Sequence, residues 1–338
     1  MHEENKIVFT TQASRRHQQV LSEIYSEECD IPKLRALAWH GVPHDLRPTV
    51  WQLLLGYLPQ SNKRRQETLE RKRNEYFQHI ALIFEARQDH QTEKHIKDLK
   101  QIEDDIPRTQ SQIPLFRTEP LRTILRRLLY IWSVRHPASG YVQGINDLCS
   151  VFLLVFMQPF CSYRVTSEEG GLPDNINEIE ADVFWCLTII MDSIQDYFFP
   201  QSPGIQRALS YILYIVARVD SDLAEHFKTQ NLEMIHFCFR WLNCMFVREF
   251  PLELVFRLWD SLLSMSDGIG TLSVYVGSAM VLKWASELKK KDFNELVMFL
   301  QTLNTKAWTE RELEEVLSRA YLYFSWFQNS PNHLKHVS

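Results

Sequence analysis

An arginine follows a carboxylate by three residues in a short segment that contains a proline. The segment covers residues 102–109 and reads I-E-D-D-I-P-R-T. Pro107 disfavours helix at the residue before it, so Arg108 is expected to leave the helical surface and project. Asp105 can hold this arginine or its loop by a charge-assisted hydrogen bond. A surface ion pair at a helix end is the alternative interpretation of these residues.

A glutamine lies in a second short segment, residues 140–147, which reads G-Y-V-Q-G-I-N-D. The glycines on either side of Gln143, Gly140 and Gly144, allow the backbone to turn tightly. Asn146 or Asp147 is expected to cap the apolar helix that follows. A plain corner between two helices is the alternative interpretation.

Together the two segments favour a role in phosphoryl transfer. An arginine can neutralise charge on a transferring phosphate and a glutamine can orient the attacking water, which are two tasks of GTP hydrolysis. The chain contains no G-x-x-x-x-G-K-[ST], G-x-G-x-x-G, H-E-x-x-H or G-x-S-x-G motif. It therefore has no recognisable nucleotide cradle of its own, and Arg108 and Gln143 would act in trans.

The elements that must position these loops are predicted to be helices. Only 10 glycines occur in 338 residues, and no Asn-Gly or Asp-Gly pair lies between alternating apolar runs. Apolar residues recur at helical spacing from Leu121 to Trp132 and again after Pro251. Thr309 and Glu312 have the spacing of a capping box, which predicts a helix start. Trp51 is predicted to be a core residue, and Trp241 and Trp259 likewise.

Composition excludes several classes of function. Apolar residues make up 45% of the chain and the net charge is −5, which fits a globular protein and disfavours nucleic acid as a partner. The 6 cysteines form no C-x-x-C pair, which favours a reducing cytosol, and the 12 histidines do not suggest a metal site. We expect no signal peptide. The apolar run Leu148–Met157 is too short for a membrane helix, which needs about 20 residues.

Several blocks of the sequence then resemble the TBC-domain family of Rab GTPase-activating proteins, in the family's order. They run from about residue 34 to about residue 327. Residues 135–140 and 180–186 look most similar to the yeast Gyp-type branch and its animal counterparts. The blocks are G-V-P at 41–43, R-x-x-x-W at 47–51, I-x-x-D-x-x-R-T at 102–109, Y-V-Q-G at 141–144, and the late segments 239–241, 248–251 and 257–260.

The resemblance implies an all-α fold of two lobes with a groove between them. Residues 1–30 would be a flexible extension and residues 31–330 the Rab-GAP TBC domain. Its N-terminal lobe, about 31–180, would carry both finger loops, and its C-terminal lobe would span about 181–330.

The resemblance further implies a GTPase-activating protein for Rab-family small GTPases in the GTP-bound state, acting in vesicle trafficking. Arg108 would be the arginine finger and Gln143 the glutamine finger. The chain would carry no cofactor, because GTP and Mg²⁺ belong to the partner. The residues that would support the finger loops are Asp105, Tyr141, Gly144 and Asn146, and the candidates for partner binding are Arg47, Thr109 and Val142.

The expected location is the cytoplasm, peripherally at endomembranes through partners and without direct membrane insertion. The branch resemblance alone would suggest the Golgi.

Two alternative functions stay open. One is a non-catalytic Rab effector or scaffold that uses the same groove. The other is a helical scaffold unrelated to GTPases. An effector has no need of Arg108 or Gln143, so substituting Arg108 separates these readings.

Overall fold

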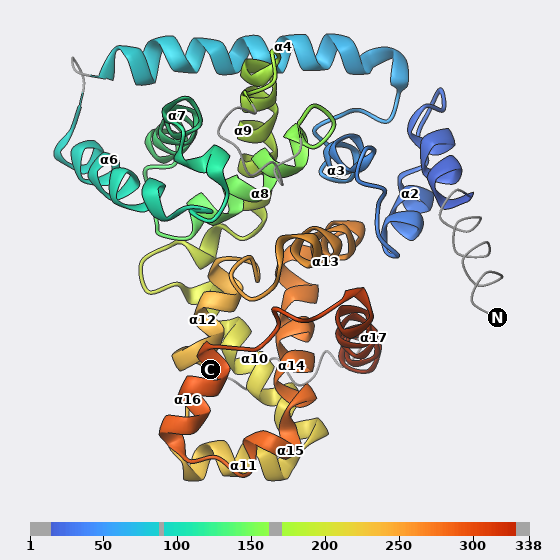
Figure 1. The fold of residues 1–338 in the computed structure, drawn as a ribbon, viewed down its shortest axis with the longest axis vertical. Helices are drawn as coiled ribbons and strands as arrows, with labels where there is room; N and C mark the ends of the chain where they lie inside the picture. Colours follow the sequence, from blue (N-terminus) through green and yellow to red (C-terminus); the bar gives the residue numbers. More distant parts are fainter. Residues whose placement is uncertain (1–14, 88–90, 162–170, 329–338) are drawn as a thin grey trace. The chain divides into compact units, whose positions relative to one another are not determined.

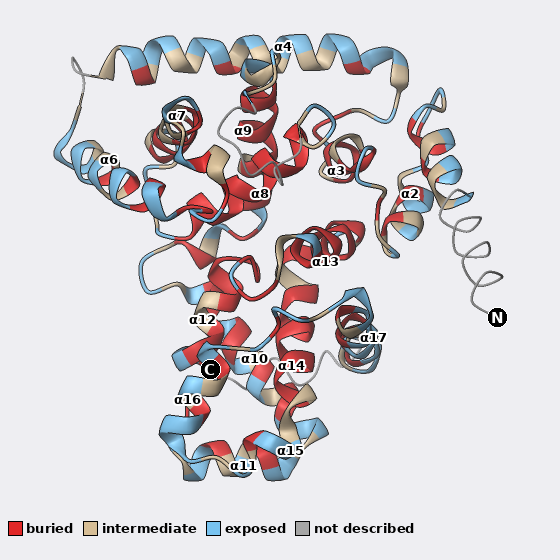
Figure 2. Cartoon of the chain, in the orientation of Figure 1, coloured by how far each residue is buried: buried red, intermediate tan, exposed pale blue. Residues whose placement is uncertain are grey.

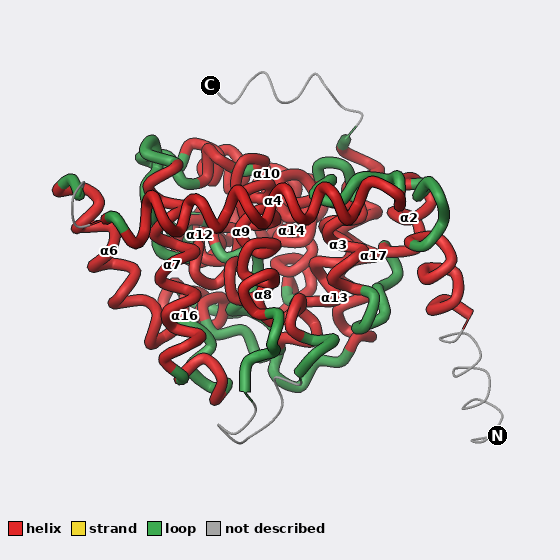
Figure 3. Tube along the Cα trace, turned by 90° about the horizontal axis from the view of Figure 1, so that it is seen from above, coloured by secondary structure: helices red, strands yellow, loops and turns green. Residues whose placement is uncertain are grey.

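The fold is helical throughout the part of the chain that the structure describes. The computed structural model describes residues 15–87, 91–161 and 171–328. Within these ranges there is no named strand, only one antiparallel bridge between Glu28 and Ser61 (Figure 3). The all-α class predicted from the sequence is confirmed. No helix among these residues is both long and apolar enough to cross a bilayer.

The chain divides into two compact units, Met1–Asp192 and Ser193–Ser338. The lobe boundary near residue 180 and the groove between lobes stay predictions. The helices of the first unit, shown in blue to green in Figure 1, are α2 (Ile31–Ala38), α3 (Arg47–Leu54), η1 (Asn62–Arg64), α4 (Arg65–His79), the π-helix η2 (Ile80–Glu85), α6 (Glu93–Asp105), η3 (Ile106–Arg108), η4 (Pro114–Arg117), α7 (Glu119–Arg135), α8 (Ile145–Met157) and α9 (Ile176–Ser193).

The core of the first unit is built around α8. All 13 residues of this helix are buried, and Figure 2 shows it almost entirely red. The ring of Trp51 on α3 is fully buried and meets Phe152 of α8 edge to face at 5.9 Å between ring centroids. The predicted apolar stripe of α7, from Leu121 to Trp132, is also buried. A helix that is apolar around most of its circumference is typically buried, as α8 is.

Two buried carboxylates on α9 hold its neighbours. Glu180 accepts hydrogen bonds from Arg127 of α7 and Tyr76 of α4. Burial raises the pKa of Glu180, although Arg127 and Tyr76 act in the opposite direction. Asp182, one turn away from Glu178, accepts from Arg73 of α4 at 2.9 and 2.8 Å. These two ion pairs join α9 to α4 and to α7.

The expected flexible extension over residues 1–30 is wrong for its described part. Residues 15–24 are helical, and Val20 and Ile24 on this helix are fully buried. Arg65 of α4 donates to the carbonyl oxygen of Ile24. Sequence reasoning missed this because two apolar residues spaced four apart make only a short stripe. Residues 1–14 lie outside the described residues.

The second unit is a separate set of helices. Trp241 and Trp259 are fully buried in it, so their predicted core role is confirmed, and Thr309 forms the predicted capping box with Glu312. Pro251 is the N-cap of the helix it was expected to open. The helices are η5 (Gln195–Tyr197), α10 (Pro203–Val219), α11 (Ser221–Thr229), α12 (Ile235–Asn243), α13 (Leu252–Ser264), the π-helix η6 (Gly268–Leu272), α14 (Ser273–Lys283), α15 (Ala285–Leu288), α16 (Phe293–Gln301) and α17 (Glu310–Phe327).

Candidate functional site

The arginine loop continues directly from α6. The helix starts at a capping box, in which Thr92 and His95 satisfy each other's backbone N–H groups. Ile102 and Ile106 anchor its end in the core, and η3 then carries Arg108 outward. The Arg108 side chain is exposed and makes no hydrogen bond or ion pair with any residue that the structure describes. The alternative of a surface ion pair at this position is therefore disfavoured.

The glutamine loop joins α7 to α8 and turns at two glycines. Gly140 has φ +66° and Gly144 has φ +110°, a region that residues with a Cβ rarely adopt. Gly144 is the N-cap of α8, so the expected cap at Asn146 or Asp147 is wrong. The reason is that Asn146 already lies in the first helical turn and points inward. Gln143 is exposed on the turn.

A buried hydrogen-bond network joins the two loops. The Tyr141 hydroxyl donates to Asp105 Oδ2 at 2.9 Å and lies 3.2 Å from Asn146 Oδ1. Asn146 Oδ1 accepts from the backbone N–H of Gly144 at 3.0 Å, and Asn146 Nδ2 donates to Thr109 Oγ1 at 2.9 Å. Thr109 Oγ1 in turn donates to the Asp105 carbonyl oxygen at 3.0 Å. The four predicted loop-supporting residues thus meet in one cluster, together with Thr109.

The electrostatics of the cluster keep its tyrosine neutral. Burial raises the pKa of the Tyr141 hydroxyl, and the neighbouring carboxylate of Asp105 raises it further. A hydroxyl that does not ionise remains a hydrogen-bond donor over the whole physiological range of pH. The network is therefore a fixed support for the loops, and the side chains of Arg108 and Gln143 are exposed beside it.

Two residues that hold these loops were missed by sequence reasoning. Gln110 adopts φ +46° directly after Thr109, and its Nε2 donates to Ser150 Oγ of α8 at 3.1 Å. Asp98 on α6 accepts from the backbone N–H of Tyr141 at 3.1 Å. The only signal for Asp98 is its spacing of seven residues from Asp105, which puts both on one helix face. Nothing in the sequence indicates the left-handed backbone of Gln110.

The candidates for partner contact differ in exposure. Thr109 is 1% exposed and Arg47 is 7% exposed, and Arg47 donates to the carbonyl oxygen of Val42 at 2.9 Å. Both side chains have an internal role in the fold and offer little surface to a partner. Val142 is partly exposed beside Gln143. Of the three, Val142 is best placed to contact a docked protein.

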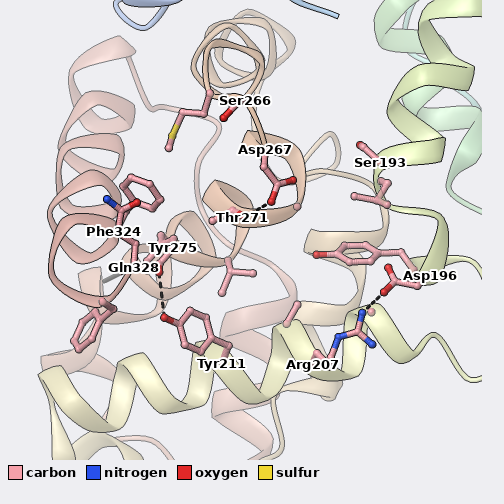
Figure 4. A pocket seen from close by; sticks show the side chains of 18 residues that line it. Ser193, Asp196, Arg207, Tyr211, Ser266, Asp267, Thr271, Tyr275, Phe324 and Gln328 are labelled. Carbon is pink, nitrogen blue, oxygen red and sulfur yellow. Dashed lines mark hydrogen bonds and ion pairs between the residues drawn. The ribbon is translucent and has the colours of Figure 1, made fainter. Parts of the chain in front are cut away.

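A separate pocket lies within the second unit and contains none of the predicted site residues. Its volume is about 810 Å³ and it lies among α10, η6, α14 and α17 (Figure 4). The hydroxyls of Tyr211 and Tyr275 face each other at 3.1 Å, and Arg207 pairs with Asp196 at one end. Its lining includes an arginine and a glutamine, Arg207 and Gln328, but Arg207 is held in the ion pair with Asp196.

The chain matches known proteins along most of its length. Residues 44–289 match the family model of the Rab-GTPase-TBC domain. TBC1 domain family member 22B of Homo sapiens is 40% identical over 313 residues, which cover 92% of this chain and 61% of that protein. GTPase-activating protein gyp1 of Schizosaccharomyces pombe is 38% identical over 313 residues, covering 90% of this chain and 60% of that protein. The chain thus spans about three fifths of these relatives.

Solved structures agree with these matches. The crystal structure of the Ypt/Rab-GAP domain of Gyp1p has a TM-score of 0.86 and 37% identity, and the match covers 93% of this chain and 98% of that one. The TBC domain of a Chlamydomonas flagellar RabGAP, at 20% identity and a TM-score of 0.53, shares the fold. The resemblance to the Gyp-type branch and its animal counterparts is confirmed.

Proposed function

This chain belongs to the Rab-GTPase-TBC domain family, and on that premise we propose that it is a GTPase-activating protein for a Rab-type small GTPase in its GTP-bound state. The observation that supports this function best is the pairing of two exposed side chains over one buried network. Arg108 and Gln143 come from separate loops, and Tyr141, Asp105, Asn146 and Thr109 tie those loops together.

In the proposed reaction Arg108 approaches the γ-phosphate of the partner's GTP. Its guanidinium stabilises charge that develops on the phosphate oxygens in the transition state, and the Gln143 carboxamide orients the attacking water. GTP, Mg²⁺ and the phosphate-binding groups belong to the partner, because this chain has no nucleotide-binding motif. An arginine supplied in this way accelerates hydrolysis by about 10³- to 10⁵-fold.

The buried network makes two exposed fingers effective. Groups that already point where charge will develop need no reorganisation during the reaction, which is the main source of electrostatic catalysis. The loops that carry Arg108 and Gln143 are fixed by hydrogen bonds to α6 and α8 before any partner arrives. Val142, next to Gln143, would contact the partner's surface.

The proposed setting follows from the proposed partner. A protein that acts on lipid-anchored GTPases works at the surface of endomembranes and takes part in vesicle trafficking. We place the chain in the cytoplasm, at membranes only through its partners, without a cofactor of its own. Golgi membranes are the first place to look, given the branch to which it is similar.

The proposal is tested by single-turnover GTP hydrolysis with a panel of purified Rab proteins, each loaded with GTP and mixed with the wild-type chain. We expect one or a few members to be accelerated by at least about 10³-fold. Rabs that bind the chain with no change in hydrolysis would identify an effector or scaffold. If no Rab binds or responds, the proposed function is wrong.

A further inference from the structure

Helix α6 binds Tyr141 through both its backbone and its side chain. The backbone N–H of Tyr141 donates to Asp98 Oδ2 at 3.1 Å, and its hydroxyl donates to Asp105 Oδ2 at 2.9 Å. The two carboxylates are seven residues apart, so they lie on one face of α6 about two turns from each other. Both are buried, with 6% and 5% of their surface exposed.

We propose that Asp98 is a positioning residue for Gln143, acting through the backbone of Tyr141. This inference rests on the proposed GTPase-activating function. Asp98 lies outside the sequence blocks that carry the family resemblance, and its side chain does not reach the exposed surface where Gln143 lies. Its effect on catalysis would come only from where it fixes the start of the glutamine loop.

The packing of Gly140 shows how closely this loop lies against α6. A Cβ added at Gly140 would come within 2.8 Å of Asp98 Oδ2 and 2.9 Å of Lys94 Cε. Lys94, one turn before Asp98, donates from Nζ to the carbonyl oxygen of Pro137. At residue 140 a side chain would therefore have to displace the Asp98 carboxylate and the end of Lys94. Asp98 and Lys94 together define its path.

The chemistry of the contact explains why a hydrogen-bond acceptor is needed at residue 98. The N–H of Tyr141 is buried, and a buried donor without an acceptor costs about 1–3 kcal/mol. A charged acceptor gives the stronger hydrogen bond. Gln143 follows only two residues later, and a misplacement of about 1 Å at a catalytic group can cost about 10²-fold in rate. Only Val142 separates Tyr141 from Gln143, so a shift at Tyr141 would be passed on to Gln143.

The arrangement makes α6 a common frame for both fingers. Arg108 continues from the C-terminal end of α6 through η3, and the loop of Gln143 is fixed to the same helix by Asp98 and Asp105. The distance between the two finger loops is thus set by a single rigid element. Removal of Asp98 would leave the arginine loop in place and displace the glutamine loop alone.

The test is a double-mutant cycle in this chain, measured with the Rab that responds to the wild type. Asp98→Ala is expected to lower the single-turnover rate constant about 10- to 100-fold and to leave the Kd for the GTP-bound Rab within about 2-fold. In a Gln143→Ala background the same change should cause no further loss, because Asp98 acts only through Gln143. Asp98→Asn should restore much of the rate, since its amide oxygen still accepts from Tyr141.

A matched control comes from the second unit. Asp220 accepts from the backbone N–H of Leu223 at 3.0 Å and pairs with Lys289 at 2.7 Å, far along the chain from either finger. Asp220→Ala should leave the rate constant unchanged. If Asp98→Ala does not fold, Asp98→Glu, which displaces the carboxylate by one methylene, takes its place in the cycle.

The outcomes separate the two proposals. A loss from Asp98→Ala that is equally large in the Gln143→Ala background would overturn the positioning role, as would an unchanged rate constant or a loss confined to Rab affinity. If the wild-type chain accelerates no Rab, the proposed function fails and the positioning role fails with it. A wild-type chain that works while Asp98 proves dispensable would leave the proposed function standing.

Discussion

At the scale of single residues, the site combines exposed groups with a buried support. Arg108 and Gln143 are both exposed, whereas Tyr141 is buried and bonded to Asp105 on the other loop. A guanidinium is planar and always charged, and it can bridge two phosphate oxygens. The exposed pair would therefore contact the partner, and the buried residues fix the loops that carry this pair.

Arg108→Lys is predicted to lose almost as much GTPase acceleration as Arg108→Ala. Lysine keeps the charge but lacks the planar fork, so it cannot bridge two oxygens of the transferring phosphate. The single-turnover rate constant of the responding Rab measures this, with Arg117→Lys, at the exposed end of η4, as the control. A near-normal rate for Arg108→Lys would count against the finger role.

Tyr141→Phe is predicted to lower the free energy of unfolding by about 1–3 kcal/mol, because the buried Asp105 carboxylate would lose the donor it has in that hydroxyl. Chemical denaturation gives the difference. Tyr211→Phe is the matched control: its hydroxyl bonds to that of Tyr275 in the second unit, where no buried carboxylate depends on it. Equal costs for the two variants would show that the network has no special stability.

Features of the site that depend on neighbouring residues could be predicted from the sequence, whereas contacts between distant residues could not. The two glycines indicate the glutamine loop, and the family blocks single out Arg108 and Gln143. The break expected before Pro107 is wrong, because Ile106 keeps αR backbone and α6 runs on into η3. Asp98 escaped notice because its partner, the N–H of Tyr141, is distant along the chain. The inward direction of Asn146 escaped for the same reason, since it depends on where Thr109 lies.

At the scale of helices, the end of α4 is held by a neutral histidine. Arg135 Nη1 lies 2.8 Å from His79 Nε2, and since arginine can only donate, this nitrogen of His79 must accept. The ring lies 6.0 Å from those of Phe184 and Trp185 on α9, centroid to centroid. Burial lowers the pKa of His79 and Arg135 lowers it further, while Glu75 opposes them.

The protein is therefore predicted to lose stability on acidification through His79. In the unfolded chain this histidine binds a proton near its ordinary pKa of about 6.5, whereas in the folded chain it does so only at lower pH. The contribution is present above about pH 6.5 and is lost as the pH falls below that value. Unfolding of the wild type and of His79→Gln at pH 7.5 and 5.5 measures it. The wild type should lose more on acidification, and equal losses would refute the prediction.

Helix periodicity was predictable and helix irregularity was not. The stripe of α7 and the capping box of α17 can be recognised from spacing alone, because each depends on neighbours within a few residues. The π-helix over Ile80–Glu85 reads in sequence as one more apolar turn after α4. A π-helix is rare, and the spacing of apolar residues does not distinguish it from an α-helical turn.

At the scale of the whole molecule, both finger loops belong to the first unit. The network of Asp98, Asp105, Thr109, Tyr141 and Asn146 that supports them lies within Met1–Asp192. The all-helical class was predictable because glycine is scarce and apolar spacing is helical throughout. The division between Asp192 and Ser193 was not, since it falls within the last turn of α9 and no break in the sequence marks it.

The isolated chain is predicted to bind no GTP, with or without Mg²⁺. It has no phosphate cradle in its sequence, and the proposed mechanism assigns the nucleotide to the partner. Isothermal titration of Mg²⁺·GTP into the chain should give no binding heat. Titration of the responding Rab, loaded with GTP, into the same chain is the positive control. Tight nucleotide binding by the chain alone would contradict the proposed division of roles.

The most direct test of the central claim is a comparison of catalysis with binding in Arg108→Ala and Gln143→Ala. For each variant, the single-turnover rate constant of the responding Rab is measured beside the Kd for that Rab loaded with a non-hydrolysable GTP analogue. The proposed function predicts a rate that falls by about 10³-fold or more for Arg108→Ala, a marked loss for Gln143→Ala, and a Kd that changes little for either. Wild-type rates in both variants would contradict the two-finger site.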